Sequence, residues 1–312
     1  MKALVTGGAG VRLESVPEPE PHPGQALVEV AAVAVNRGEL ALMDVLPAGS
    51  RLGWDVAGTV VRAAADGSGP PAGTRVAVLA ERDGWAERIA VSPSRLAPLP
   101  DGVEWPAAAA LPVAGLTALY ALEYAGPLLG RTVLITGAGG GVGRMLVQLA
   151  HLAGAEVIAQ VGSPDRAEGL RGLGARSVTT YAGSPGGQGD EQGDGEPVDV
   201  LLDSSGGQVL AGAFRGLRPG GTLVAYGNTA RQELRLPVDW GHARPGLHVR
   251  YLHLFDEVTR RSVARDLAAL LRLAASERLT PQVASVGSWS DPGPAFDALR
   301  GRRANGKVVL TL

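Results

Sequence analysis

The spacing of apolar positions changes near residue 115. Before it, short β-branched runs at 27–35, 58–62 and 75–79 alternate with Pro/Gly clusters such as 17–24, which predicts a small β-rich domain of strands and turns rather than helices. From residue 116 onward, strand-like runs alternate with helical patterns, which predicts a doubly wound parallel sheet. The expected elements are strand 132–136, helix 142–153, strand 156–161, helix 164–173, strand 198–203, helix 208–217, strand 221–226, strand 248–254, a helix over about 258–276 and strand 307–312.

These elements predict an α/β protein of two domains. The first covers 1–116 and is completed by about 256–312, and the second covers 117–255. Residues 182–197 are glycine-rich, acidic and without apolar periodicity, which predicts a flexible surface loop. Thr6–Gly10 follows a short apolar strand but leads into a proline-rich stretch that no crossover helix can use, so a hairpin turn is expected.

A cluster of glycines separates the strand 132–136 from the helix that follows it. Glycines in a strand–loop–helix unit permit a tight turn and a close approach to a pyrophosphate, and the helix dipole favours the anion. A second apolar strand follows after one helix length, as a nucleotide-binding βαβ unit requires. The alternative is a merely tight strand-to-helix turn. The candidate cofactor-binding residues are Gly137, Ala138, Gly140, Gly141, Val142 and Gly143.

The same glycine spacing also fits the phosphate loop of short-chain dehydrogenases. Those enzymes need a Tyr-x-x-x-Lys catalytic pair. The only lysines are Lys2 and Lys307, and neither lies four residues after a tyrosine, so that alternative fails.

Charge and composition narrow the class of partner. The 312 residues carry a formal net charge of −2, so there is no basic excess of the kind that binds nucleic acid or an anionic membrane, and a small-molecule partner is expected.

The sequence contains no long apolar run of the kind found in a membrane span or a signal peptide, which favours a cytoplasmic protein. The absence of cysteine excludes disulfides, thiolate zinc sites, iron–sulfur clusters and a cysteine nucleophile.

Several segments, in order and spacing, resemble the medium-chain dehydrogenase/reductases, and within them the zinc-independent quinone oxidoreductase and enoyl reductase branch. They are 35–40, 53–58, 111–118, the glycine loop, 198–203, 226–228 and 306–310. The resemblance implies a GroES-like β-rich catalytic domain plus a Rossmann nucleotide-binding domain. It also implies a homodimer formed by the edge strands of the nucleotide domains, for which the runs 221–226 and 247–252 are candidates.

Metal binding is judged from the residues present. Zinc-dependent relatives use a cysteine near position 36 and a Gly-His-Glu segment, whereas this chain has Gly53-Trp54-Asp55 and no cysteine. No two of its five histidines have the i, i+4 spacing of a helical metal pair. Without a metal, oxidation of simple alcohols is disfavoured. Hydride transfer to a quinone, or to the C=C of an α,β-unsaturated carbonyl, is expected instead, with an apolar conjugated substrate.

The resemblance implies that Asn36 and Thr117 lie near the nicotinamide as catalytic residues, although Asn36 also fits a turn residue that ends a strand. Many enoyl reductases of the family carry a tyrosine proton donor just after this asparagine, and Arg37 stands there instead. The proton donor is therefore not assigned. Asp44 and Asp55 are conceivable donors, but surface or hairpin positions fit both better.

The segment after strand 156–161 indicates NADPH as the cofactor. NAD enzymes place an acidic side chain at this strand tip, whereas Gly162 and Ser163 stand here and leave room for a 2′-phosphate. Asp165 fits a helix N-terminal acid better than a ribose ligand. The resemblance implies that Arg166, Tyr181 and Arg303, or its neighbour Arg302, share the phosphate. It further implies that Ser204, Gly227 and Asn228 line the cofactor.

Two alternatives to an NADPH-dependent quinone or enoyl reductase stay open. One is an NADPH-binding enzyme of a biosynthetic pathway with a dedicated, possibly non-redox step. The other is a cofactor-binding protein without turnover. Separately from these alternatives, Arg166 and Arg303 could be solvated surface residues instead of phosphate ligands.

Overall fold

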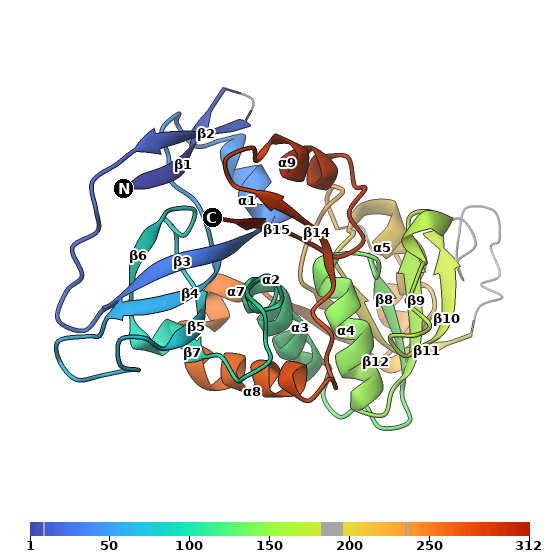
Figure 1. Ribbon diagram of the computed structural model, residues 1–312. Helices are drawn as coiled ribbons and strands as arrows, with labels where there is room; N and C mark the ends of the chain where they lie inside the picture. Colours follow the sequence, from blue (N-terminus) through green and yellow to red (C-terminus); the bar gives the residue numbers. More distant parts are fainter. Residues whose placement is uncertain (9, 182–195, 235, 237) are drawn as a thin grey trace. The chain divides into compact units, whose positions relative to one another are not determined.

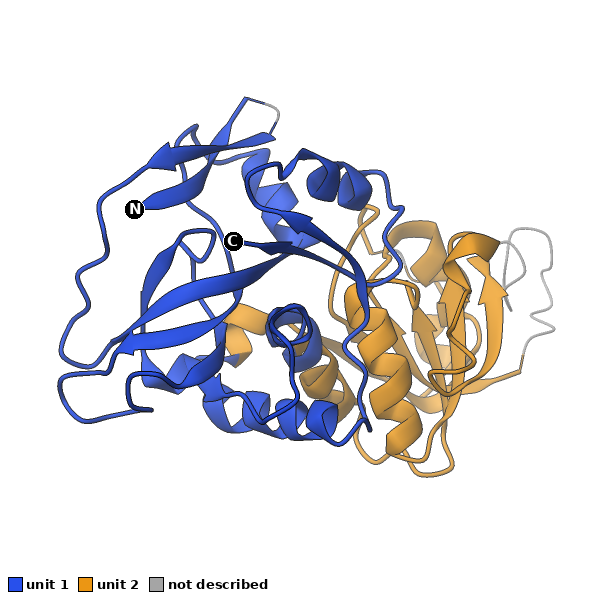
Figure 2. Cartoon of the chain, in the orientation of Figure 1, with its two compact units in different colours: residues 1–116, 258–312 blue, residues 117–257 orange. Residues whose placement is uncertain are grey.

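The computed structural model describes residues 1–312 except 9, 182–195, 235 and 237 (Figure 1). The chain divides into two compact units, coloured separately in Figure 2. Unit 1 contains residues 1–116 and 258–312, and unit 2 contains residues 117–257. Unit 1 is therefore built from two stretches that are far apart in the sequence.

In the described part of unit 1, seven strands form one sheet in the order β14-β15-β3-β4-β5-β7 with β6 paired to β3, and β1 pairs antiparallel with β2. The strands are β1 (Lys2–Gly7), β2 (Gly10–Ser15), β3 (Ala26–Val35), β4 (Asp55–Arg62), β5 (Arg75–Leu79), β6 (Arg88–Val91), β7 (Leu96–Pro98), β14 (Val283–Ser288) and β15 (Lys307–Thr311). The helices are α1 (Arg37–Met43), the 3-10 helix η1 (Pro93–Arg95), α2 (Trp105–Ala109), α8 (Val263–Ala275) and α9 (Gly293–Arg300). The last strand β15 pairs antiparallel with β3, which inserts the end of the sequence into the first domain's sheet.

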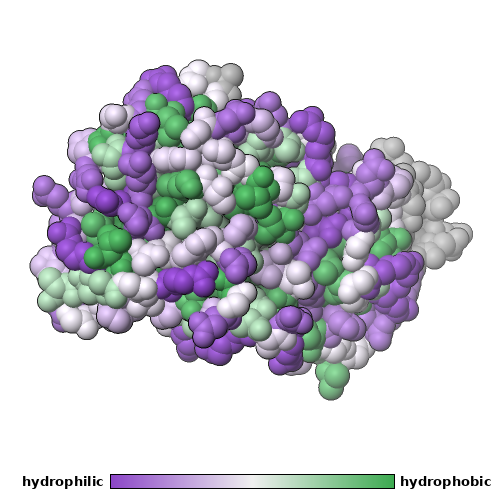
Figure 3. Space-filling view, viewed as in Figure 1, coloured by the Kyte–Doolittle hydropathy of each residue, from purple (hydrophilic) through white to green (hydrophobic). Residues whose placement is uncertain are grey.

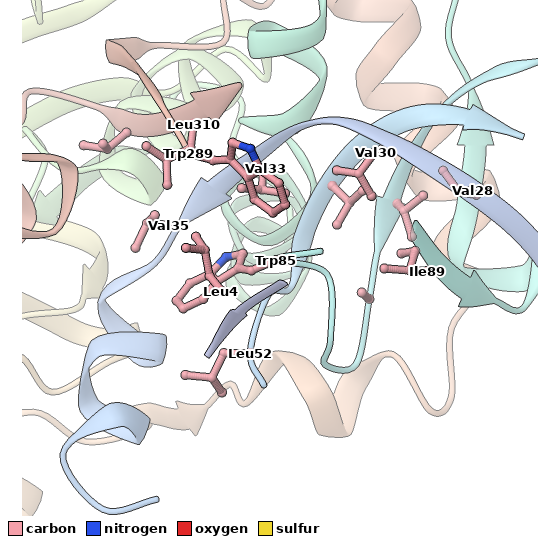
Figure 4. Close-up of a cluster of buried hydrophobic side chains, with 14 of the residues drawn as sticks. Leu4, Val28, Val30, Val33, Val35, Leu52, Trp85, Ile89, Trp289 and Leu310 are labelled. Carbon is pink, nitrogen blue, oxygen red and sulfur yellow. The ribbon is translucent and has the colours of Figure 1, made fainter. Parts of the chain in front are cut away.

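A cluster of buried hydrophobic side chains holds unit 1 together (Figure 4). It combines valines of β3 with Leu4, Trp85, Trp289 and Leu310. Trp85 meets Phe296 of α9 edge to face, with ring centroids 5.3 Å apart. Burial of such large side chains is the main stabilising contribution, and here it joins the two sequence stretches.

Six described strands of unit 2 form a parallel sheet in the order β10-β9-β8-β11-β12-β13. The strands are β8 (Thr132–Thr136), β9 (Glu156–Val161), β10 (Ala175–Thr180), β11 (Val198–Asp203), β12 (Leu217–Ala225) and β13 (His248–Tyr251). The helices are α4 (Gly141–Leu152), the 3-10 helix η2 (Pro164–Arg166), α5 (Gly207–Phe214), α6 (Trp240–Ala243) and α7 (Leu254–Glu257), while α3 (Pro112–Ala125) crosses from unit 1 into unit 2. The strand order and parallel pairing confirm the predicted doubly wound parallel sheet.

Three strand predictions in unit 2 were accurate, at 132–136, 156–161 and 198–203, but β10 was not predicted and β12 begins at Leu217 rather than at 221. The predicted helix 208–217 ends earlier, at Phe214, and the predicted helix 164–173 was wrong. The predicted helix 164–173 is only the single turn η2 followed by further turns. Gly169 has φ of +76°, so α-helical geometry cannot continue through the segment, and Gly174, with φ of +107°, directly follows it. The predicted strand 248–254 ends at Tyr251, and α7 begins at Leu254.

The N-terminal half contains helices that the pattern did not predict. Both α1 and α2 lie before residue 115, and α3 starts at Pro112. The first two are too short to show a helical period, at seven and five residues. The hairpin expected at Thr6–Gly10 is confirmed by the pairing of Gly7 with Gly10, and most of the predicted loop 182–197 lies outside the described residues.

Among the described residues, no helix is long and apolar enough to cross a membrane. On the face in Figure 3, hydrophobic residues occur as separate spots among hydrophilic ones.

Candidate functional site

The carboxyl ends of β8 and β11 form the switch point of the parallel sheet. The chain leaves β8 toward β9 on one side, whereas β11 continues toward β12 on the other, and ligands of such sheets bind where the order reverses. Thr136 Oγ1 donates to Asp203 Oδ1 at 2.5 Å, and Asp203 Oδ2 accepts from Gly206 N at 2.9 Å. Burial raises the pKa of Asp203. This pair fastens the turn after β11 to the end of β8.

The glycine loop begins immediately after Thr136, and two of its positions accept no side chain. Gly137 has φ of +64°, and a Cβ there would lie 2.5 Å from Ser204 Oγ. A Cβ at Gly143 would lie 2.4 Å from Gly137 O and 2.6 Å from Ala138 Cα. The close packing of α4 on the loop therefore requires glycine, as a pyrophosphate-binding turn does.

Backbone amides of the loop divide into two groups. Ala138 N donates to Gln160 O and Gly140 N donates to Gly137 O, each at 3.0 Å, so these two amides maintain the shape of the loop. The amides of Gly141, Val142 and Gly143 lie in the first turn of α4, where helix geometry provides no acceptor. Together with the helix dipole, they are the groups that could hold a phosphate.

Tyr181 follows β10 and lies over the start of the loop. Its Oη accepts from Gly137 N at 3.2 Å and shares a hydrogen bond with Ser205 Oγ at 3.0 Å. A Cβ at Gly162 would come within 3.3 Å of Tyr181 Cε2. The structure therefore brings three predicted cofactor residues, Gly137, Gly162 and Tyr181, to one edge of the sheet.

A second turn lies next to this edge. Ser204 N donates to Thr136 Oγ1 at 3.2 Å, and a Cβ at Gly227 would lie 3.3 Å from Ser204 O. Asn228 Nδ2 donates to Gln232 O at 2.7 Å, which closes the turn after β12. Ser204 thus adjoins the glycine loop and Gly227 packs on Ser204, whereas Asn228 lies beside Gly206, where a Cβ would be 2.3 Å from Asn228 Oδ1.

The predicted phosphate-binding arginines lie in different units. Ser163 precedes η2 as its N-cap residue and Arg166 ends η2. A Cβ at Gly139 would lie 3.2 Å from Arg166 Nε, so this side chain lies against the glycine loop. Arg303 is an exposed residue after α9 in unit 1, and its meeting with Arg166 stays a prediction.

Unit 1 contains a buried polar cluster formed by Asn36, Glu39, Asp55 and Lys307. Lys307 Nζ donates to Asp55 Oδ2 and to Asn36 Oδ1, both at 2.6 Å. Asn36 Nδ2 donates to Asp55 Oδ2 at 2.8 Å and to Glu39 Oε2 at 3.1 Å. Asp55 has no exposed surface and the Lys307 side chain is 4% exposed, so the charged groups compensate each other in place of water.

This cluster determines the orientation of the Asn36 amide. Its oxygen must face the ammonium, which can only donate, and its NH2 group must face the two carboxylates. Both N–H bonds are consequently used within the protein. Towards any bound molecule, Asn36 offers only the remaining lone pair of Oδ1 as an acceptor.

Glu39 is the most strongly perturbed acid of unit 1. Burial, with a contribution from the charge of Asp55, raises its pKa from 4.5 to about 8, although Lys307 and Asn36 act in the opposite direction. Glu39 Oε1 accepts from Trp54 N at 2.8 Å, and Oε2 accepts from Asn36 N at 2.8 Å. The side chain therefore holds the first turn of α1 in place through these hydrogen bonds. Its burial becomes less favourable when the carboxyl group ionises.

We expect the stability of the protein to fall as pH rises through neutrality because of Glu39. A carboxyl whose pKa is raised by folding binds its proton more tightly in the native state, so its contribution is complete below pH 4.5 and is lost as pH rises to about 8. Between about pH 5 and pH 8 the loss should be about 3 kcal/mol. Urea unfolding at both values measures it. Glu39→Gln should flatten this slope, whereas the exposed control Glu20→Gln should keep it; an unchanged slope in Glu39→Gln would contradict the assignment.

The interpretation of Asp55 as a surface or hairpin residue was wrong. Its partner Lys307 is 252 positions away in sequence, so no local pattern shows the pair. One signal was present, because a lone lysine that begins an apolar strand run needs a buried counter-ion. Thr136, Asp203 and Arg144 were also missed, the first two because they look like ordinary strand ends.

Thr117 lies in α3 and is 5% exposed. It belongs to unit 2 and Asn36 to unit 1, so their predicted meeting at the nicotinamide stays a prediction. Within the described ranges, no group of three His, Cys, Asp or Glu side chains is placed to hold a metal ion.

Family models of known proteins match segments of both units. Residues 22–101 match the family model "Alcohol dehydrogenase GroES-like domain", and residues 141–273 match "Zinc-binding dehydrogenase". Quinone oxidoreductase-like protein 2 of Bos taurus is 30% identical, over 83% of this chain and 76% of that protein. The chain belongs to the medium-chain dehydrogenase/reductase superfamily, in its quinone oxidoreductase branch.

Two further proteins to which the chain is similar bear on its chemistry. The quinone oxidoreductase from Thermus thermophilus is 30% identical to this chain, with a TM-score of 0.84. The match covers 100% of both chains, and the structure of that enzyme was also determined in complex with NADPH. The spectinabilin polyketide synthase system protein NorB of Streptomyces orinoci is 36% identical over 93% of this chain. The chain spans 13% of the length of that synthase.

Proposed function

We propose that the protein is an NADPH-dependent, zinc-independent oxidoreductase that transfers hydride to a quinone or to the C=C of an α,β-unsaturated carbonyl. The observation that carries the proposal is the Asp55–Lys307 pair. Asp55 stands in the segment that holds zinc in metal-dependent relatives, and its carboxylate is neutralised by an ammonium 2.6 Å away and also accepts from Asn36 Nδ2 and Val113 N. Because the Asp55 carboxylate is already occupied by these partners, we expect a hydride acceptor that needs no metal ion for activation.

The tip of β9 supports NADPH over NADH. No carboxylate stands at Gly162 or Ser163 to bind a ribose 2′-hydroxyl, and Arg166 lies against Gly139 within the same unit. The glycine positions that exclude a Cβ fit a pyrophosphate at the first turn of α4. The NADPH complex of the Thermus thermophilus enzyme further supports this choice.

The proposed reaction balances without a further cofactor. NADPH held at the glycine loop would supply the hydride that adds to the β-carbon of the acceptor, leaving NADP+. The π electron pair moves to the carbonyl oxygen, and the resulting enolate takes a proton from solvent at the α-carbon. Because the Asn36 N–H groups are used within the protein, we assign Asn36 an acceptor role toward the cofactor and not stabilisation of the enolate.

Isotope labelling tests the reaction. We expect NADPH deuterated at C4 to label the β-carbon of an enone or of a 2-enoyl thioester, with the α-hydrogen coming from solvent. Quinones should be reduced and a saturated ketone should not, with unchanged rates after dialysis against a chelator. The polyketide synthase relative favours a thioester, and the quinone oxidoreductase relatives favour a quinone.

Three outcomes would contradict this proposal. Label at a carbonyl carbon would indicate a carbonyl reductase. A product formed from an enoyl thioester without NADPH oxidation, or cofactor binding without turnover on any acceptor, would favour the non-redox and non-catalytic alternatives.

The edge strand β13 supports a proposed homodimer. All its residues are exposed, including Val249 and Tyr251 at 44% and 66%, and unpaired edges tend to join another strand. We expect light scattering at about 10 µM to give twice the mass of one chain. Val249→Lys should shift the mass toward one chain, whereas Val286→Lys on the exposed strand β14 should not; the reverse result would place the interface elsewhere.

A further inference from the structure

Arg144 is a buried cation in the nucleotide-binding unit that neither the glycine motif nor the proposed function explains. It follows Gly143 on α4 and is 4% exposed. Its Nη2 donates to Glu168 O at 2.6 Å, and its Nε lies 3.4 Å from Gly139 O. One side chain thus connects the glycine loop before its own helix to the segment that follows η2.

Arg166 lies between these two attachment points. A Cβ at Gly139 would lie 2.8 Å from Arg166 O and 3.1 Å from Arg166 Cβ, so this residue covers the loop at the position that Arg144 also contacts. Burial lowers the pKa of Arg144, and the charge of Arg166 lowers it further. Two guanidinium groups therefore approach one glycine loop, where their mutual repulsion is relieved by an anion.

We propose that Arg144 is a positioning residue for cofactor discrimination, because its hold on Glu168 O and Gly139 O keeps Arg166 beside the glycine loop, where the 2′-phosphate of NADPH binds. This proposal rests on the proposed use of NADPH. Arg144 is too buried to bind the phosphate itself, so it acts through Arg166.

Arginine suits this role for a geometric reason. Its planar guanidinium presents donors in a fixed fork, so it reaches two carbonyl oxygens on different segments without a flexible linkage. Lysine has a single nitrogen that cannot hold both oxygens in the same way. Methionine retains the apolar stem but removes both hydrogen bonds.

Equilibrium binding of NADPH and NADH tests the proposal without any substrate. We expect Arg144→Met to weaken NADPH binding about tenfold and NADH binding less than about twofold, measured by fluorescence titration. Arg171→Met is the matched control, because Arg171 is an exposed arginine of the same unit whose Nη1 also donates to a backbone carbonyl, that of Arg176. It should change neither affinity. Equal losses of affinity for both cofactors in Arg144→Met would overturn the proposal, and the role of Arg144 would then be only structural.

A double-mutant cycle separates action through Arg166 from a direct effect. Arg166→Ala alone should lower the preference for NADPH, and adding Arg144→Met should lower it no further. If Arg144→Met does not fold, Arg144→Lys decides, since an unchanged cofactor preference in that variant overturns the proposal. If the wild-type protein binds NADH as tightly as NADPH, the proposed function is refuted. If the wild type prefers NADPH and both Arg144 variants keep that preference, only this inference is refuted.

Discussion

Replacing Lys307 with methionine should lower the free energy of unfolding by about 3–5 kcal/mol. The substitution keeps an apolar stem but leaves the carboxylate of Asp55, which has no exposed surface, without its cation. It also frees the oxygen of Asn36, so the amide loses its single orientation. Chemical denaturation at pH 7 measures the loss.

Two variants define the cause of this loss. Lys2→Met removes the only other lysine of the chain, at an exposed position, and should have little effect. Asp55→Leu combined with Lys307→Met should recover part of the stability, because no buried charge is then left unpaired. A loss in Lys307→Met within about 1 kcal/mol of that in Lys2→Met would mean that water or another group compensates Asp55, and the buried ion pair would be refuted.

Replacing Gly143 with alanine should weaken NADPH binding about a hundredfold. The new Cβ would meet Gly137 O at 2.4 Å and Ala138 Cα at 2.6 Å, and both are backbone atoms that cannot rotate away. Either α4 or the loop must therefore move, which displaces the amides of Gly141 and Val142. Titration with NADPH and a thermal unfolding curve of the same sample separate lost binding from lost folding.

Gly241→Ala is the matched control, because a Cβ at this helical position of unit 2 meets nothing within 4 Å. It should bind NADPH like the wild type. Normal binding by Gly143→Ala would show that the loop tolerates the displacement and that the phosphate lies elsewhere.

Local patterns were sufficient where short-range geometry determines structure. The strands at 132–136, 156–161 and 198–203 have the predicted bounds, and α4 differs by one residue at each end. Strands 132–136 and 156–161 are apolar runs that end directly before a glycine, and α4 is an amphipathic period that begins in the glycine loop. Strand 198–203 is an apolar run between Pro197 and Ser204. The segment 164–173 failed because Gly169, with a positive φ, interrupts an otherwise acceptable helical pattern.

The sequence by itself determined the class of this protein: an α/β chain with a glycine loop after the first strand of a parallel sheet, and without the cysteines and histidine segment of a zinc enzyme. Those properties depend on residues close together in the chain. Only the tertiary structure decided how the polar groups are paired. Lys307 meets Asp55 across 252 positions, Asp203 meets Thr136 across 67, and Arg144 joins the glycine loop to Glu168. A buried charge or hydroxyl takes whichever partner the packed strands and helices bring within hydrogen-bond distance, and sequence spacing carries no record of that choice.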